Sequence, residues 1–205
     1  MVKKEEKKIE PKLKVETKVD IVPINIKQTV FKIEGKSPLL MDKMPEEVLQ
    51  AIQDKQTGKG KTGKTTRDIK AETFRAVHIL PDGSVGFPSL GFTAGMIEST
   101  SFVGDSKFSK KLIRGLRVLN SVNGLIPIKF KTQDVNKHNV GSNTKYSPQF
   151  NDWSCELELQ FDANNLSIQD IATLINYAGF YYGIGMWSPR CKSGGNYGMY
   201  ALAKK

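Results

Sequence analysis

"WSCELELQFD", residues 153–162, and "SIQDIATLINYAG", residues 167–179, set a strand directly before a helix. Apolar and polar residues alternate in the first segment, which is the period of a strand with one buried face. In the second segment, Ser167 is suited to the N-cap, Asp170 follows three residues later, and Gly179 is suited to the C-cap. A strand followed by a capped helix predicts a sheet domain of the α+β class.

The segments before this pair carry similar signals. One or two strands are predicted at 21–35, with Ile24, Ile26, Val30 and Ile33 among the inward-facing candidates. The other predicted elements are strands at 73–80, 84–87, 124–131 and 197–203, and helices at 46–56 and 89–103. Small residues on one side of the helix at 89–103 indicate close packing there.

Two connecting segments are also readable. "PDG" at 81–83 predicts a tight hairpin turn between the strands at 73–80 and 84–87. Residues 132–152 are polar and rich in Asn, Ser and Gly, so we expect a long loop.

Composition limits the class of partner. The 205 residues include 31 Lys and Arg against 21 Asp and Glu, a net charge of +10, which favours a polyanion, with nucleic acid first. Cys155 and Cys191 are too few for a disulfide scaffold and lack metal-ligand spacing. No apolar run reaches the roughly 18 residues that span a bilayer, and the first residues lack the apolar core of a secretory signal. These features predict a cytoplasmic protein with no membrane partner.

Residues 1–20 form a separate region by composition. They hold seven Lys and five acids with few apolar residues, so we predict a disordered tail, followed by a single domain over 21–205. The tail either adds long-range attraction to a polyanion or simply keeps the protein soluble.

"GKGKTGKTT" at 58–66 matches both the P-loop pattern and the dinucleotide fingerprint. Both patterns require a buried strand before the glycine turn, whereas the preceding residues predict a helix. We therefore predict no nucleotide cofactor here. The segment is either a solvated linker or a basic loop that contacts a phosphate backbone through Lys59, Lys61, Lys64 and Arg67.

The C-terminal segment "GIGMWSPRCKSGGNYG" at 183–198 carries more information. Glycines let the backbone approach a ligand, cations contact phosphates, and aromatic rings stack on unpaired bases. The residues of these three kinds are Gly183, Gly185, Gly194 and Gly195, then Arg190 and Lys192, then Trp187 and Tyr197. The alternative is a structural hairpin with Trp187 in the core.

This loop resembles the glycine-rich C-terminal loop of the RAMP superfamily, the RNA-binding proteins of CRISPR systems. Gly183-Ile184-Gly185 is similar to the first half of the motif, whereas eight residues rather than about five precede Gly194-Gly195. "GKSPLLM" at 35–41 also looks like the exit from the first strand in that group. The resemblance implies a ferredoxin-like, RRM-like antiparallel sheet with helices on one face and inserted basic loops.

Four segments together resemble a family of uncharacterised bacteriophage proteins, over roughly residues 30–200. They are "SPLLM", "LPDGSVGFPSLGF", "YSPQFNDWSCELEL" and the glycine-rich loop. This resemblance implies a phage context, and thus the cytoplasm of a bacterial host, but no particular activity.

"KFSKKLIRGLR" at 107–117 is a second basic segment and contains no acid. On a helix, Lys107, Lys110, Lys111 and Arg114 share one face, with Arg117 following. A face of one sign fits contact with a nucleic-acid backbone, although ordinary solvation is the alternative. Phe102, Phe108 and Phe130 occupy apolar-periodic positions, so we expect them in the core.

Signals for catalysis are weak. His138 with Lys137, Lys145 and Tyr146 would mimic the RNA-cleaving site that the RAMP resemblance implies for some members. His78 falls in a predicted strand, where a structural role is favoured. The acids Asp42, Asp82, Asp152 and Asp162 fall singly at turns, which predicts no metal site.

We therefore predict non-catalytic binding of single-stranded nucleic acid, RNA or DNA, without a cofactor, by a chain that is a possible homo-oligomer along the strand. The predicted contacts are Lys59, Lys61, Lys64, Arg67, Lys107, Lys110, Lys111, Arg114, Arg117, Gly183, Gly185, Trp187, Arg190, Lys192, Gly194, Gly195 and Tyr197. The alternatives are a RAMP-type endoribonuclease and a phage protein-interaction or nucleotide-binding module.

Overall fold

The computed structural model describes residues 23–58, 68–104, 108–140, 143–192 and 194–204. The predicted tail, the basic segment 59–67 and Lys107 lie outside these ranges. The strands are β1 (Ile26–Gly35), β2 (Leu39–Leu40), β3 (Gly86–Pro88), β4 (Arg117–Val118), β5 (Leu125–Pro127), β6 (Thr132–Val140), β7 (Asn143–Asn151), β8 (Ser154–Asp162) and β9 (Tyr200–Leu202). The helices are α1 (Glu46–Gln56), α2 (Ile69–Arg75), α3 (Ser89–Val103), α4 (Lys110–Ile113) and α5 (Ile168–Tyr181). The fold is mixed α+β, as predicted.

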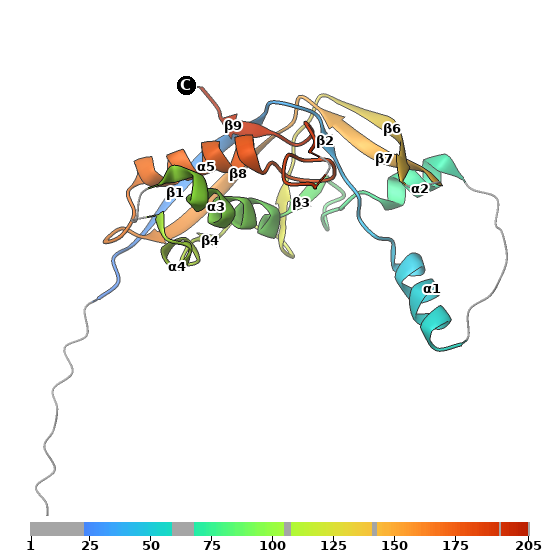
Figure 1. Ribbon diagram of the computed structural model, residues 1–205, viewed down its shortest axis with the longest axis horizontal. Helices are drawn as coiled ribbons and strands as arrows, with labels where there is room; N and C mark the ends of the chain where they lie inside the picture. Colours follow the sequence, from blue (N-terminus) through green and yellow to red (C-terminus); the bar gives the residue numbers. More distant parts are fainter. Residues whose placement is uncertain (1–22, 59–67, 105–107, 141–142, 193, 205) are drawn as a thin grey trace, which may run out of the picture.

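The main sheet has the order β4-β8-β1-β9, and each neighbouring pair is antiparallel. Helices α3 and α5 pack against each other and lie over one face of this sheet (Figure 1). The predicted alternation in β8 is confirmed, because Cys155, Leu157, Leu159 and Phe161 are buried. These side chains and the inner faces of the two helices form the core.

Strand β1 corrects part of the predicted core. Ile33 is buried as predicted, but Ile24, Ile26 and Val30 are exposed. Successive side chains in a strand point to opposite faces, so Val30 shares the outer face with polar neighbours, and Phe31 joins Ile33 inside. The apolar residues of this segment occupy both strand faces, which made its inward face ambiguous.

A second sheet has the order β2-β7-β6 and replaces the long loop predicted at 132–152. That prediction was wrong because polar side chains bond across the strands of this hairpin. Asn136 Nδ2 donates to Gln149 Oε1 at 2.9 Å, and Asn151 Nδ2 donates to Asp134 Oδ2 at 2.6 Å. Such cross-strand pairs stabilise strands whose composition resembles that of a loop.

The two sheets are joined tightly where β1 leads into β2. The Gly35 N–H donates to the Trp153 carbonyl at 2.8 Å, and the Trp153 indole N–H donates to the Ser37 carbonyl at 2.8 Å. A Cβ at Gly35 would overlap the Trp153 ring, so only glycine allows this contact. The buried indole therefore fixes the chain at the junction of the sheets.

The predicted strand at 73–80 is instead helix α2 and a bend. Asp68 caps α2 by accepting from the N–H groups of Lys70 and Ala71, and Thr73 Oγ1 donates to the Ile69 carbonyl. The turn predicted at "PDG" is confirmed, with the Leu80 N–H donating to the Ser84 carbonyl at 2.8 Å. Across that turn only Ile79 and Val85 form a bridge, and the strand that follows, β3, pairs with β5.

The helices predicted at 46–56 and 89–103 are confirmed as α1 and α3. Ser167 and Asp170 form a capping box at the start of α5, as their spacing predicts. The predicted C-cap was wrong, because α5 continues past Gly179 to Tyr181. A Cβ at Gly179 would overlap the Tyr200 carbonyl, so this glycine permits close packing of α5 on β9.

Candidate functional site

The glycine-rich loop, residues 183–198, connects α5 to β9 and is folded back onto the protein. The Ile184 N–H donates to the Gly198 carbonyl at 2.9 Å, which closes the loop on itself. The Met186 N–H donates to the Leu40 carbonyl at 3.0 Å, and the Gly198 N–H donates to the Pro38 carbonyl at 2.7 Å. These bonds attach the loop to the connection between the two sheets.

Most of the predicted glycines serve this internal packing. Gly185 has a φ of 80°, and a Cβ there would overlap the Leu40 carbonyl. Likewise, a Cβ at Gly195 would overlap the Trp187 carbonyl, and one at Gly183 would crowd the Gly198 carbonyl at 2.9 Å. Gly194 differs, since nothing lies within 4 Å of its missing side chain. Of these four glycines, Gly194 alone has open space beside it.

The loop aromatics are half-buried against β6. The Trp187 ring meets the His138 ring edge to face, with centroids 5.8 Å apart. Tyr197 accepts a hydrogen bond at its hydroxyl from Asn136 Nδ2 at 3.2 Å. Trp187 has a φ of 57°, an uncommon backbone conformation for a residue with a side chain. Both aromatics therefore hold the loop on the hairpin, and neither belongs to the buried core.

His138 is not presented as a general base. The residue lies in β6, opposite Lys145 of β7, and not in the loop expected from its sequence. Both ring nitrogens are buried and have no hydrogen-bond partner among the described residues. Lys145 donates instead to Asp42 Oδ2 at 2.6 Å. A base must reach the proton that it removes, so this arrangement gives no support to cleavage at His138.

Two other titratable side chains lie away from open solvent, Cys155 buried and His78 half-buried. Burial, and then the charge of Glu156, raises the pKa of the Cys155 thiol to about 12. A thiol with such a pKa stays protonated at neutral pH and is a poor nucleophile. Burial, followed by the nearby charge of Lys43, lowers the pKa of His78, whose ring packs edgewise near Phe87.

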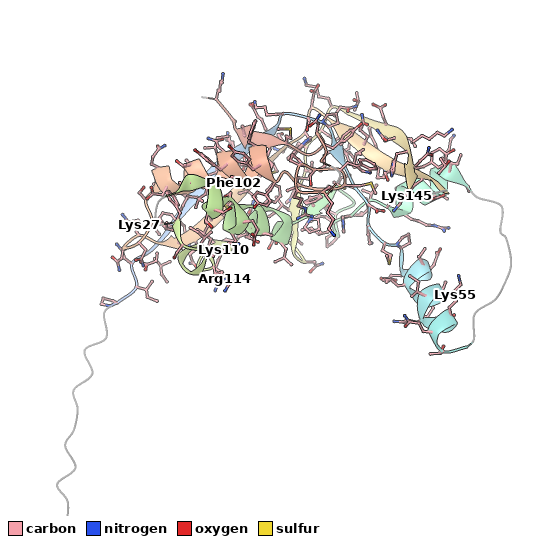
Figure 2. The ribbon with its side chains drawn as sticks, viewed as in Figure 1. Lys27, Lys55, Phe102, Lys110, Arg114 and Lys145 are labelled. Carbon is pink, nitrogen blue, oxygen red and sulfur yellow. The ribbon has the colours of Figure 1, made fainter. Side chains whose placement is uncertain are left out.

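The basic segment 107–117 does not form the long helical face that was predicted. Helix α4 covers only Lys110–Ile113. It is therefore too short to align cations along one helical face over two turns. Arg117 turns back and donates through Nη1 to the Arg114 carbonyl at 2.6 Å. Figure 2 shows Lys110, Arg114 and Phe102 at one end of the molecule, away from Lys55 and Lys145. The cations of the described residues thus do not all line one groove.

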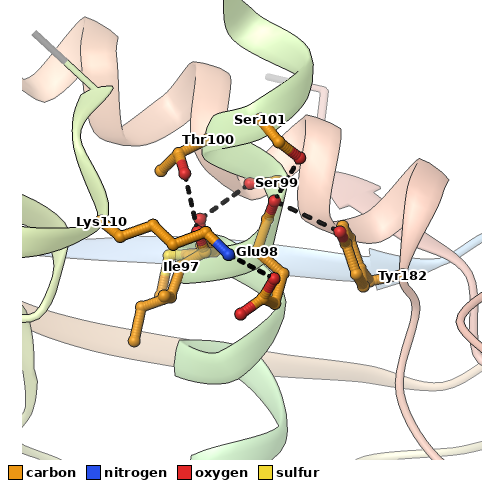
Figure 3. Close-up of polar contacts among 8 residues, drawn as sticks. Ile97, Glu98, Ser99, Thr100, Ser101, Lys110 and Tyr182 are labelled. Carbon is orange, nitrogen blue, oxygen red and sulfur yellow. Dashed lines mark hydrogen bonds and ion pairs between the residues drawn. The ribbon is translucent and has the colours of Figure 1, made fainter. Parts of the chain in front are cut away.

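Lys110 and Tyr182, the residue just before the glycine-rich loop, nevertheless meet around one residue of α3. Lys110 Nζ lies 2.6 Å from Glu98 Oε2, and the Tyr182 hydroxyl donates to the Glu98 carbonyl at 3.2 Å. Figure 3 shows Lys110 and Tyr182 on the two sides of Glu98. The backbone N–H of Arg190, inside the loop, donates in turn to the Tyr182 carbonyl at 3.3 Å. A continuous path of contacts therefore connects the Lys110 side chain with the backbone of Arg190.

A cluster of aromatic residues lies beside this path and was missed by the sequence analysis. The Phe102 and Tyr181 rings stack face to face, with centroids 4.2 Å apart and planes 2° from parallel. Phe180 meets Tyr181 at 5.0 Å, and Tyr177 meets it at 5.8 Å. We call Phe102, Tyr177, Phe180, Tyr181 and Tyr182 the aromatic surface cluster.

Three of the five residues of this cluster are open to solvent, and Tyr177 and Tyr182 are half-buried. Phe102, Phe180 and Tyr181 are 49%, 60% and 41% exposed, so the prediction that Phe102 lies in the core was wrong. Helix α3 carries apolar residues on several sides, which hid the outward position of Phe102. The available signal was "FYY" at 180–182, three consecutive aromatics that cannot all face inward on one helix.

The outer face of the main sheet has a different character. The outward positions of β8 include Glu156 and Glu158, opposite Lys32 and Val30 of β1. No outward position of β1 or β8 is aromatic. Exposed rings near cations suit a ligand with flat π faces and negative charge, so the chemistry points to the aromatic surface cluster and not to the sheet.

A cavity of about 610 Å³ lies between α1, α2 and β7. Its charged side chains include two ion pairs, Asp42 with Lys145 and Glu47 with Arg75. Across the described ranges, no three His, Cys, Asp or Glu side chains are grouped to hold a metal ion. In the same ranges, no helix has the length and hydropathy needed to cross a membrane.

Comparison with protein-family models and with curated protein sequences finds no match to this chain.

Proposed function

We propose that the protein binds single-stranded nucleic acid, RNA or DNA, without catalysis, and that the aromatic surface cluster is the centre of the site. The observation that carries this proposal is the exposed Phe102–Tyr181 stack, beside a path that links Lys110 with Arg190. Unpaired bases stack on such rings, and the two cations contact the phosphates that connect the bases.

Energetics favour this ligand class. Stacking of one base on an aromatic side chain contributes about 1–3 kcal/mol, irrespective of base identity. Bases in a duplex are already stacked, so an exposed ring pair favours unpaired strands. The net charge of +10 adds a long-range attraction that any phosphate backbone shares. Together these terms support tight binding with little sequence preference.

We further propose a ferredoxin-like, RAMP-like architecture for the main sheet. In support, the connection from β1 to β4 contains α3, together with β2, α1, α2, β3 and α4, and the connection from β8 to β9 contains α5. Each connection joins strands of the main sheet that are separated by one other strand. This is the split β-α-β connection repeated twice. A phage protein acting in the cytoplasm of a bacterial host, as the sequence resemblance implies, fits this proposal.

The test is a binding titration with a fluorescent single-stranded oligonucleotide, of about 4–16 nucleotides to match known site sizes. We expect Phe102→Ala to weaken binding by about 5- to 150-fold, equivalent to about 1–3 kcal/mol. Phe74→Ala is the matched control, because Phe74 is an equally large side chain that is 68% exposed on α2. Its binding should equal that of the unmodified protein.

Arg190→Gln is a second variant for the same titration. Loss of the positive charge should weaken binding to RNA and DNA alike, since the expected contact is to phosphate. Equal binding by the Phe102→Ala and Phe74→Ala proteins, with both folded by circular dichroism, contradicts the proposed site. Cleavage of the oligonucleotide by the purified protein would contradict the non-catalytic role.

A further inference from the structure

Strand β6 leaves one long edge of the second sheet open. It has nine residues, pairs with β7 on one side, and ends the order β2-β7-β6. Within the described ranges no strand pairs with its other side. The strands at the other sheet edges, β2, β3, β4, β5 and β9, have two or three residues each. A strand of nine residues with free backbone groups is a template for adding another strand.

The side chains along this edge favour an amphipathic strand as the occupant. Val135 of β6 lies opposite Pro148 of β7, so the two side chains share one face of the hairpin. Pro148 is buried, whereas Val135 is 51% exposed at the open edge. An added strand with apolar residues at every second position would cover Val135 and continue this apolar row.

The sequence contains such a segment outside the described residues. "KLKVETKVDI", residues 12–21, alternates without interruption: Leu13, Val15, Thr17, Val19 and Ile21 fall on one side, and charged residues fall on the other. Its ten residues match the length of β6. A period of two is the signature of a strand with one covered face.

The position of the chain start decides which copy supplies the segment. The described chain begins at Pro23, next to β1, at the end of the molecule opposite the β6–β7 hairpin (Figure 1). A chain's own segment would have to run back along the whole molecule to reach β6. In a head-to-tail arrangement, the segment of a neighbouring copy starts beside the hairpin.

We propose that residues 12–21 of one copy add as a strand to the open edge of β6 in a second copy. Each copy donates one segment and accepts one, so the contact is heterologous and extends into open chains. Backbone hydrogen bonds of β6 provide affinity, and burial of Val135 by the alternate apolar residues provides register. The proposal does not depend on nucleic-acid binding.

Sedimentation velocity over a wide range of protein concentration, without nucleic acid, tests the association. We expect the average mass of the full chain to rise with concentration. A Val15→Glu, Val19→Glu double variant should remain monomeric, because it removes the apolar side. A Lys14→Gln, Lys18→Gln double variant changes net charge by the same amount on the polar side and should still associate.

Hydrogen exchange locates the contact. The amides of residues 132–140 should exchange more slowly at high than at low concentration, and a synthetic peptide of residues 12–22 should have the same effect on the Val15→Glu, Val19→Glu variant. Exchange at β9, the short edge of the main sheet, is the internal control and should not change.

Three results would overturn the proposal. They are a monomer at all concentrations, equal association of the two double variants, and protection at α1 or β9 in place of β6. Because no nucleic acid is present, none of these results bears on the proposed binding function.

Discussion

Gly95 and Gly179 both lie within helices at the α3–α5 contact, but their surroundings differ. A Cβ at Gly95 would rest 3.5 Å from Ala178 Cβ, an ordinary van der Waals contact, whereas one at Gly179 would overlap the Tyr200 carbonyl. We expect Gly179→Ala to lower the free energy of unfolding by about 1–3 kcal/mol, because β9 must shift. Gly95→Ala should change it little or raise it by up to about 1 kcal/mol, through better helix propensity. Urea denaturation of the two variants measures both effects, and equal values would contradict this account.

His78 predicts a pH dependence of stability at the same scale. Burial, and then Lys43, lowers the pKa of His78 from its ordinary 6.5 in the folded chain. The unfolded chain therefore takes up a proton at a pH where the folded chain resists it, and stability falls as pH decreases from the unfolded pKa through the folded one. His78→Gln should flatten this part of the curve. Thermal unfolding of both proteins across the weakly acidic range measures this dependence of stability on pH. The same dependence in the variant as in the unmodified protein would show that His78 is not its cause.

At the scale of elements, the capping box of α5 is the clearest local determinant. Ser167 Oγ accepts from the Asp170 N–H at 3.1 Å, and Asp170 Oδ2 accepts from the Ser167 N–H at 2.9 Å. Ser167→Ala should cost about 1 kcal/mol of stability. Ser167→Thr retains the hydroxyl, which also donates to Asp170 Oδ2 at 2.8 Å, and serves as the conservative control in thermal unfolding. A full loss with threonine as well would show that the cap is not the source of the effect.

Local signals explain which elements the sequence predicted well. The N-cap residues of α1, α3 and α5 are Pro45, Pro88 and Ser167, and each of them acts within one turn of its own position. The hairpin β6–β7 was missed because its polar pairs, such as Asn136 with Gln149, form between residues distant in sequence. Gly179 was wrongly predicted as the C-cap of α5 for a similar reason. Glycine is required at this position because β9 packs against it, and not because the helix ends there.

The candidate site was harder to predict than the fold. Sequence reasoning named Lys110 and Arg190 as contacts to the same ligand but did not identify the residues that connect them, and it placed Phe102 in the core. Their connection runs through Glu98 and Tyr182, and it depends on how α3 crosses α5. Such a contact is a product of tertiary packing, which leaves no periodic pattern in the chain.

For the whole molecule, charge distribution predicts how binding responds to salt. Each phosphate contact that a cation makes on a single strand contributes about 0.7 to the slope of log affinity against log salt concentration. Lys110→Gln and Arg190→Gln should each flatten the slope by about that amount. Lys55→Gln, a change at the far end of the molecule (Figure 2), should leave it the same. Equal slopes in all three variants would show that the measured affinity does not come from phosphate contacts at the proposed site.

The two tryptophans of the chain occupy contrasting environments, and this makes each a distinct optical reporter. Trp153 is 1% exposed at the junction of the sheets, so its emission is that of an indole shielded from water and follows global unfolding. Trp187 is only half-buried in the glycine-rich loop, where a soluble quencher reaches it first. Intrinsic fluorescence of a Trp153-only chain and a Trp187-only chain thus separates the integrity of the scaffold from events at the loop, with no added dye.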